Sequence, residues 1–234
     1  MPTSTVEQYI KTIYQQEERS SGKIVQMKQL SEAMGVTPGT ATAMVKHLAQ
    51  RQLIAYVPRK GVRLTARGRT LALTMVRRHR LIETFLEHVL GYDWSEVHED
   101  AERLEHAVSD KFIERIDAYL GSPSADPHGD PIPSAEGHIA RRGSIPLDRC
   151  ETGDSVRIAR LRNDDPAFLL MMKEQRLIPG ETFEVTDKNE TAGTVTVQHD
   201  RGVAPFTISM GHSTRIMVDA VGEAPADVPE NRHP

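Results

Sequence analysis

The chain has 234 residues, of which 38% are hydrophobic, enough to bury the core of one large domain or two ordinary ones. No apolar run reaches the roughly eighteen residues of a membrane span, and the N-terminus lacks the charged and apolar regions of a secretion signal. The single cysteine, Cys150, excludes an intramolecular disulfide and fits a reducing cytoplasm, where we expect the protein to act.

The net charge of −4 conceals an uneven distribution along the chain. Residues 1–80 contain fourteen Lys and Arg against four Asp and Glu, whereas the remaining 154 residues contain fifteen against twenty-nine. A basic block of this kind indicates a polyanionic partner, usually nucleic acid. Charge alone is equally compatible with a solvated basic face.

The N-terminal third predicts three helices and a hairpin. Apolar residues at helical spacing place the helices over residues 4–18, 27–34 and 37–52. Thr37 is the expected N-cap of the third helix, because Pro38 follows at the first helical position. Two short strands, 54–57 and 62–64, flank a Pro-Arg-Lys-Gly turn.

The rest of the chain predicts two longer helices and then a β-rich segment. The helices cover residues 66–91 and 95–120, and a Pro- and Gly-rich crossing or linker follows. Short apolar runs then alternate with turn signals, which predicts a small β-barrel. The expected strands are 155–161, 182–186, 193–197, 203–208 and 215–221, with one helix over 165–176.

These elements predict a mainly α-helical protein with a small amount of β-structure. We expect a winged helix-turn-helix domain, a helical domain, a β-barrel and a disordered tail. Their boundaries are residues 1–72, 73–142, 143–222 and 223–234.

The helix-turn-helix is the expected DNA-reading module. Its second helix would enter the major groove with small hydroxyl residues that contact phosphates and thymine methyl groups. The candidate DNA-binding residues on this helix are Thr37, Pro38, Gly39, Thr40, Thr42 and Lys46. The strand pair predicts a wing that contacts the DNA backbone through Arg59, Lys60 and Arg63. The alternative interpretation is an ordinary helical hairpin followed by a β-ribbon.

Six residues with metal-ligating side chains lie on two neighbouring predicted helices: His79, Glu83, His98, Glu102, Glu105 and His106. The spacing places each group on one face of its helix, the second group within an arc of about 100°. Imidazoles and carboxylates on one stripe repel one another or compete for protons unless a cation lies between them, and a divalent metal meets that need. The alternative is a solvated polar face with nearby arginines as partners.

These motifs resemble the diphtheria-toxin-repressor family of iron- and manganese-dependent regulators. The resemblance rests on RHRLIETFL at 78–86, VHEDAERLEHAVSD at 97–110, DPHGDPIP at 126–133 and YIKTIY at 9–14, and it extends over nearly the whole chain. It implies a winged helix-turn-helix joined to a helical domain that dimerises and binds metal, followed by an SH3-like domain. Metal binding in this family favours the DNA-binding conformation.

The resemblance also implies the ligands of two metal sites. One site corresponds to His79, Glu83 and His98, completed by Asp164 or Asp165 and by Asp126 and His128, which stand where manganese-type members have a Cys/His pair. The other corresponds to Glu102, Glu105 and His106 with Gln8 of the first helix.

Three positions distinguish this chain within the family pattern. Glu102 stands where iron-type members have cysteine, as in manganese-type members. Gln8 replaces a methionine or aspartate and is a weaker ligand, and Lys11 replaces an acid of some manganese-type members. These replacements affect the strength of the second site, while the absence of thiolates among the ligands favours Mn²⁺, with Fe²⁺ as the alternative.

We therefore expect a manganese-dependent repressor of metal-uptake genes that binds a double-stranded DNA operator as a homodimer. An enzyme such as a metallohydrolase is disfavoured because HExxH and nucleophile-elbow motifs are absent, and neither a membrane nor an organic substrate is expected. The remaining alternative is a DNA-binding regulator that senses an organic ligand, with a purely structural polar stripe.

Overall fold

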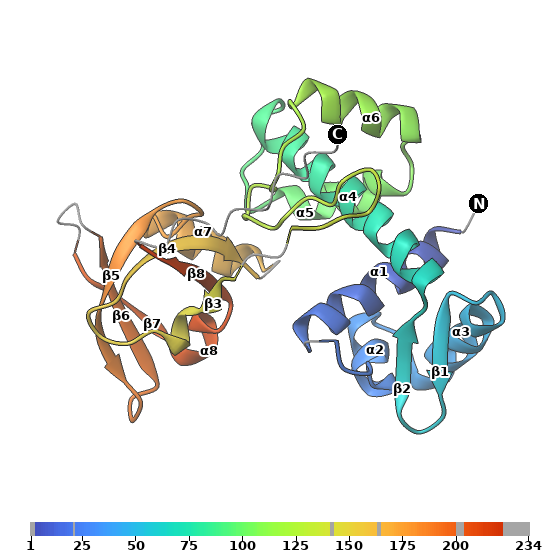
Figure 1. Cartoon of the computed structure of the whole chain (residues 1–234), viewed down its shortest axis with the longest axis horizontal. Coiled ribbons are helices and arrows are strands. Elements are labelled where there is room, and N and C mark those ends of the chain that lie inside the picture. The colour runs from blue at the N-terminus through green and yellow to red at the C-terminus, as the bar shows by residue number, and fades with distance from the viewer. Residues whose placement is uncertain (1–2, 21, 141–142, 163–164, 200–203, 222–234) are drawn as a thin grey trace, which may run out of the picture. The chain divides into compact units, whose positions relative to one another are not determined.

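The computed structural model describes residues 3–20, 22–140, 143–162, 165–199 and 204–221. The chain forms two compact units (Figure 1). The first contains Met1–Val89, Glu99–Ser124 and Pro131–Ala140, and the second contains Leu90–His98, Ala125–Asp130 and Arg141–Pro234. Among the described residues, no helix has the length and apolar character needed to cross a membrane.

The first unit begins with a helical bundle and a hairpin, as predicted. Its elements are α1 (Ser4–Arg19), α2 (Met27–Ala33), α3 (Pro38–Gln50), β1 (Ile54–Val57), β2 (Gly61–Leu64) and α4 (Ala66–His88). Thr37 caps α3 by accepting the N–H of Thr40, and Pro38 follows it, which confirms the predicted start of this helix. Ile10, Leu30 and Val62 are fully buried in the shared core. The predicted boundary between residues 72 and 73 falls inside α4, which extends from the hairpin into the helical region.

The hairpin is held against the segment that precedes α2. Its strands pair antiparallel, and Val25 and Val62 exchange backbone hydrogen bonds of 3.0 and 2.9 Å. Gly61 adopts φ 133°, and a Cβ there would lie 2.1 Å from the carbonyl oxygen of Val25. Only glycine fits this close approach, so Gly61 fixes the position of the wing.

The predicted single helix over residues 95–120 is wrong, because the structure has two helices there: α5 (Val97–Glu105) and α6 (Asp110–Tyr119). Ser109 ends the continuity, since its side chain accepts the N–H of Phe112 and caps α6. A serine hydroxyl competes with helical backbone bonds in the middle of a helix and satisfies free N–H groups at its start.

The second unit is an antiparallel sheet with short helices. Its elements are β3 (Ile145–Pro146), the 3₁₀ helix η1 (Leu147–Arg149), β4 (Ser155–Leu161), α7 (Pro166–Glu174), β5 (Thr182–Asn189), β6 (Thr194–His199), β7 (Phe206–Ser209), α8 (Met210–Ser213) and β8 (Ile216–Ala220). The strand order is β3-β8-β4-β5-β6-β7 (Figure 1). Alternate residues such as Val195 and Val197 point into the core, to which α7 adds Phe168. The predicted strands and helix are thus present, and the predicted tail, 223–234, lies outside the described residues.

Candidate metal centre and nucleic-acid interface

A cluster of acidic and imidazole side chains lies inside the first unit, where α1, α4 and α5 supply its members. His79 comes from α4, and Glu102 and Glu105 come from consecutive turns of α5. One ligand atom from each of these three residues lies within 4.8 Å of the others. His79 is 5% exposed and Glu105 is 0% exposed, so the cluster is largely removed from water.

The imidazole of His79 joins two carboxylates from different helices. Its Nδ1 lies 2.6 Å from Glu105 Oε2, and its Nε2 lies 2.9 Å from Glu83 Oε1. Burial alone would lower the pKa of His79, but the charge of Glu83 and the hydrogen bonds to Glu105 and Glu83 outweigh burial and raise it to about 9. Each nitrogen thus lies within hydrogen-bond distance of a carboxylate, and a metal that binds one of them must displace any proton that the nitrogen carries.

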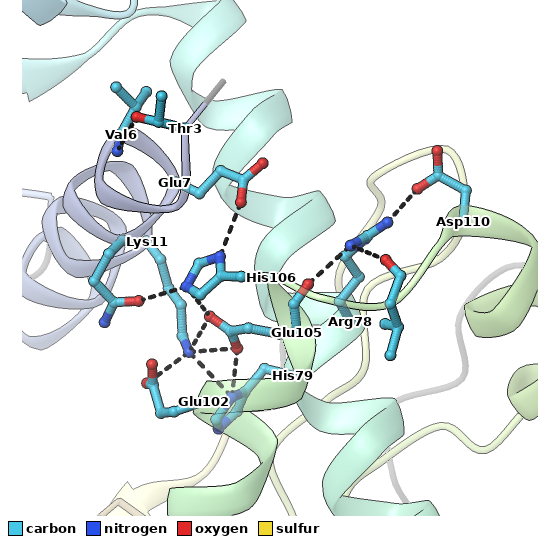
Figure 2. Close-up of polar contacts among 12 residues, drawn as sticks. Thr3, Val6, Glu7, Lys11, Arg78, His79, Glu102, Glu105, His106 and Asp110 are labelled. Atoms are coloured by element: carbon cyan, nitrogen blue, oxygen red, sulfur yellow. Dashed lines mark hydrogen bonds and ion pairs between the residues drawn. The ribbon is translucent and has the colours of Figure 1, made fainter. Parts of the chain in front are cut away.

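His106, directly after α5, faces the first turns of α1. Its Nδ1 lies 2.8 Å from Glu7 Oε2 (Figure 2). Its Nε2 lies 3.2 Å from Gln8 Oε1. The predicted pairing of Gln8 with the end of α5 is thus present as a contact. Glu7 was not among the predicted site residues. The sequence signal that could have identified Glu7 is its position four residues before Lys11, which places both side chains on one face of α1.

Lys11 occupies the centre of the cluster. Its Nζ lies 2.8 Å from Glu102 Oε1, and 2.9 and 2.7 Å from the two carboxylate oxygens of Glu105. It also lies 3.0 Å from His79 Nδ1. Figure 2 shows the lysine side chain extending from α1 to the carboxylates of α5.

The donor atoms of the cluster fit a divalent metal of intermediate hardness. Carboxylate oxygens, imidazole nitrogens and one amide oxygen are available, and such sets suit Mn²⁺ and Fe²⁺. The buried carboxylate of Glu105 and the partly exposed one of Glu102 would repel each other without a cation between them, and in the structure Lys11 supplies that charge. Cys150 is buried in the core of the second unit and takes no part in this cluster.

The N-terminal end of α3 presents the small side chains that were predicted to read DNA. Thr37, Pro38, Gly39, Thr40 and Lys46 are exposed, and Thr42 is half-buried. Some of the hydroxyls are engaged locally: those of Thr37 and Thr40 lie 2.9 Å apart, and Thr42 donates to the Pro38 carbonyl at 2.7 Å. An exposed helix start of small residues still permits close approach to a phosphate backbone.

The wing exposes its two basic tip residues and anchors a third. Arg59, Lys60 and Arg63 are all exposed, and Arg63 also donates a hydrogen bond to the carbonyl of Gly22. Glu17 of α1 holds the same hairpin from inside, since its carboxylate accepts the N–H of Leu64 at 2.8 Å. The helix that supplies Lys11 to the cluster therefore also contacts the wing.

Comparison with known proteins matches three successive segments of the chain to family domains. Residues 1–62 match the N-terminal DNA binding domain of the iron dependent repressors, and residues 65–134 match their metal binding and dimerisation domain. Residues 145–220 match the FeoA domain.

Similar proteins span nearly the full length of the chain. The iron-dependent repressor IdeR of Mycobacterium tuberculosis is 27% identical over 212 residues, which cover 89% of this chain and 90% of that protein. A solved manganese-dependent transcriptional repressor, in complex with manganese, is 38% identical, with a TM-score of 0.84 and coverage of 92% and 100%. ScaR with bound Cd²⁺ is 30% identical, with a TM-score of 0.80 and coverage of 94% and 100%.

The chain belongs to the diphtheria-toxin-repressor family. It is a metal-dependent, DNA-binding transcriptional repressor, with a DNA-binding domain, a metal-binding and dimerisation domain and a C-terminal FeoA domain. The resemblance identified from the sequence is confirmed.

Several ligands implied by the family resemblance belong to the second unit. His98 lies in the first turn of α5, and Asp126 and His128 precede the Pro131 turn. Asp126 Oδ1 accepts the N–H of His128 at 2.9 Å, and His128 Nε2 donates to the carbonyl of Trp94 at 2.8 Å. Within their own unit, both side chains therefore help to shape the turn.

Of the two acidic residues predicted as ligands before α7, only Asp165 lies among the described residues. Asp165 caps α7, because its side chain accepts the N–H of Ala167 at 3.1 Å. Asp164 lies outside the described residues.

Proposed function

We propose that the protein is a manganese-activated repressor of metal-uptake genes, with Fe²⁺ as its second activator. The observation that carries the proposal is the buried cluster of oxygen and nitrogen donors, without a thiolate, in the unit that also holds the DNA-reading helix and the wing. Oxygen-rich donor sets favour Mn²⁺ over softer ions.

Two positions in the first unit would hold metal. Glu102, Glu105 and His106 form one with Gln8, and His79 and Glu83 supply ligands to the other. When bound, the ion supplies a divalent positive charge that draws carboxylates, imidazole and amide together. Because Gln8 lies on α1 and its partners lie on or next to α5, these ligands would connect the two helices through the ion.

The contacts of α1 suggest how metal binding would reach the DNA. The first turns of the helix contact His106, and its last turn holds the wing through Glu17. Fixing the start of α1 therefore restricts the arrangement of the wing and of α3 in the same unit. Metal then favours the DNA-binding arrangement by binding it better than the alternatives.

The names of the relatives leave the physiological metal open between two ions. IdeR is named for iron and the 38% identical structure for manganese, and ScaR was solved with Cd²⁺ and with Zn²⁺. Affinity alone is a poor guide, because N/O sites generally bind Zn²⁺ more tightly than Mn²⁺. Activation at controlled free-metal concentration is the informative quantity.

The test is a gel shift with the full-length protein on the DNA upstream of a metal-transporter gene. Lanes contain buffered Mn²⁺, buffered Fe²⁺ under anaerobic conditions, or chelator. We expect a shift with Mn²⁺ at lower free metal than with Fe²⁺, and none with chelator. A shift that persists in chelator would contradict metal activation, and a much stronger response to Fe²⁺ would contradict the choice of metal.

Glu102 is the residue expected to select the metal, because iron-type members have cysteine at this position. Glu102→Cys replaces a hard oxygen ligand by a thiolate, which favours softer ions. The variant should require more Mn²⁺ and less Fe²⁺ or Co²⁺ for half-maximal DNA binding, while Glu99→Cys, on the exposed side of α5, should change neither value. An unchanged manganese preference in Glu102→Cys would remove this residue as the selector.

A further inference from the structure

Lys11 is a buried cation in direct contact with the carboxylates to which we assign metal. Its side chain is 1% exposed, Glu105 is 0% exposed, and Glu102 is 27% exposed. The ammonium has three donor protons and finds three carboxylate oxygens, one on Glu102 and two on Glu105, at 2.7 to 2.9 Å (Figure 2). Its three protons are thus shared among these three oxygens and His79 Nδ1, which lies 3.0 Å from Nζ.

The position of this ammonium overlaps with that of an ion shared by the same carboxylates. A divalent ion bound to oxygen ligands lies about 2.0 to 2.6 Å from them. An ion held by both Glu102 and Glu105 would therefore lie where Lys11 Nζ lies now. Two cations cannot share that place, because they repel each other strongly in a buried environment.

We propose that Lys11 is an internal competitor of the metal: its ammonium occupies the position between Glu102 and Glu105, and an ion binds there only by displacing it. The inference rests on the proposed function. Its consequence is that one of the two metal positions requires a higher free Mn²⁺ concentration than the other. Lys11, rather than the ligands alone, sets that threshold.

The same contacts could serve stability only, as an ion pair between α1 and α5. The two roles predict different results when the charge is removed. A purely structural lysine would lower the stability of the protein and leave metal affinity unchanged. A competitor would lower the stability of the metal-free protein, while Mn²⁺ would bind more tightly and restore the stability.

The experiment is a Mn²⁺ titration of the full-length protein, with free Mn²⁺ measured by electron paramagnetic resonance. Wild type is compared with Lys11→Met, which keeps an unbranched side chain that is one atom shorter and uncharged. The control is Lys28→Met, because Lys28 is exposed on α2 and pairs only weakly with Glu32, at 3.9 Å. Thermal unfolding of each protein is measured in chelator and in Mn²⁺.

We expect wild type to show a tight and a weak class of Mn²⁺ site. The weak class should tighten at least about tenfold in Lys11→Met, with no change in Lys28→Met. Metal-free Lys11→Met should unfold at a lower temperature than wild type, and Mn²⁺ should raise its Tm more than it raises that of wild type.

Three outcomes would overturn the role of Lys11. One is an unchanged weak class in folded Lys11→Met, and another is a single class of equally tight sites in wild type. The third is a Lys11→Met protein that stays unfolded in excess Mn²⁺, because the ion is expected to supply the missing charge. The absence of any Mn²⁺ binding in wild type would instead contradict the proposed function itself.

Discussion

Glu17 is a buried acid that connects α1 to the second strand of the wing. It is 4% exposed, and its carboxylate accepts the N–H of Leu64 at 2.8 Å and a guanidinium hydrogen of Arg69 at 2.5 Å. Hydrogen bonds to a charged group contribute about 1.5–3 kcal/mol each, less where the partner is exposed, as Arg69 is.

Glu17→Gln should lower the free energy of unfolding by about 1–3 kcal/mol, because the amide keeps the shape but turns an NH₂ group toward Arg69 or Leu64. Urea denaturation of the metal-free protein measures the change. Glu32→Gln, at an exposed position of α2, is the control and should change stability by less than about 0.5 kcal/mol. Equal stabilities of the two variants would show that Glu17 does not anchor the wing.

Cys150 is a buried thiol whose reactivity the fold suppresses. Burial first, and then the charge of Asp154, raise its pKa to about 11. At pH 8 the folded thiol is thus almost entirely protonated, whereas an unfolded cysteine with a pKa of about 8.5 is partly thiolate. Reaction with Ellman's reagent at pH 8 should be on the order of 100-fold slower in the folded protein than in urea. Similar rates would place Cys150 outside the core.

The wing carries three exposed basic residues, one of which also braces the hairpin. Arg59 and Lys60 are exposed at the tip, and Arg63 is bonded to the carbonyl of Gly22. Arg59→Ala or Lys60→Ala should weaken binding to cognate and random DNA alike and reduce the salt slope by about one, because each removes a phosphate contact.

The measurement for the wing is fluorescence anisotropy on both DNAs at several salt concentrations. Lys28→Ala, an exposed lysine outside the wing, provides the control and should preserve the slope. A loss confined to the cognate DNA would show that the wing reads bases rather than phosphates.

The sequence predicted those elements that carry strong local signals. The start of α3 was predictable because a Thr-Pro pair indicates a helix N-terminus, and the strands of the second unit were predictable because short apolar runs alternate with turn signals. The break between α5 and α6 was missed because it has neither glycine nor proline. Its only signal is Ser109 followed by Asp110. A serine cap can be recognised only when it is known whether the neighbouring backbone makes helical hydrogen bonds.

Much of the candidate site was predictable for a similar reason. Glu102, Glu105 and His106 are close in sequence, so helical spacing alone groups them. The contributions of α1 depend on how distant segments pack, and Glu7 therefore went unpredicted. The sequence shows Lys11 only as a replacement of an acid. Its ion pairs with α5 could not be predicted, because they depend on how α1 packs against α5.

The dimer of the family requires a surface that joins two copies of the chain. Helix α6 packs Ile113 and Ile116 into the first unit but leaves Phe112 45% and Tyr119 72% exposed. These two residues are seven apart and so share a face of the helix. Residues 65–134 match the dimerisation domain of the family, and this range includes α6. The exposed face of α6 is thus the expected dimer contact.

Phe112→Asp should convert the dimer to a monomer at micromolar concentration. A two-fold interface uses the same patch twice, so each substitution removes two aromatic contacts and introduces two carboxylates. Burial of a phenylalanine contributes about 1.5–3 kcal/mol, and losing it twice weakens the dimer at least about hundredfold. Sedimentation equilibrium measures the effect, and the control Lys28→Asp places the same carboxylate side chain at an exposed position on α2. If Phe112→Asp sediments as a dimer like that control, the copies join through another surface, and the exposed aromatic face of α6 needs a different explanation.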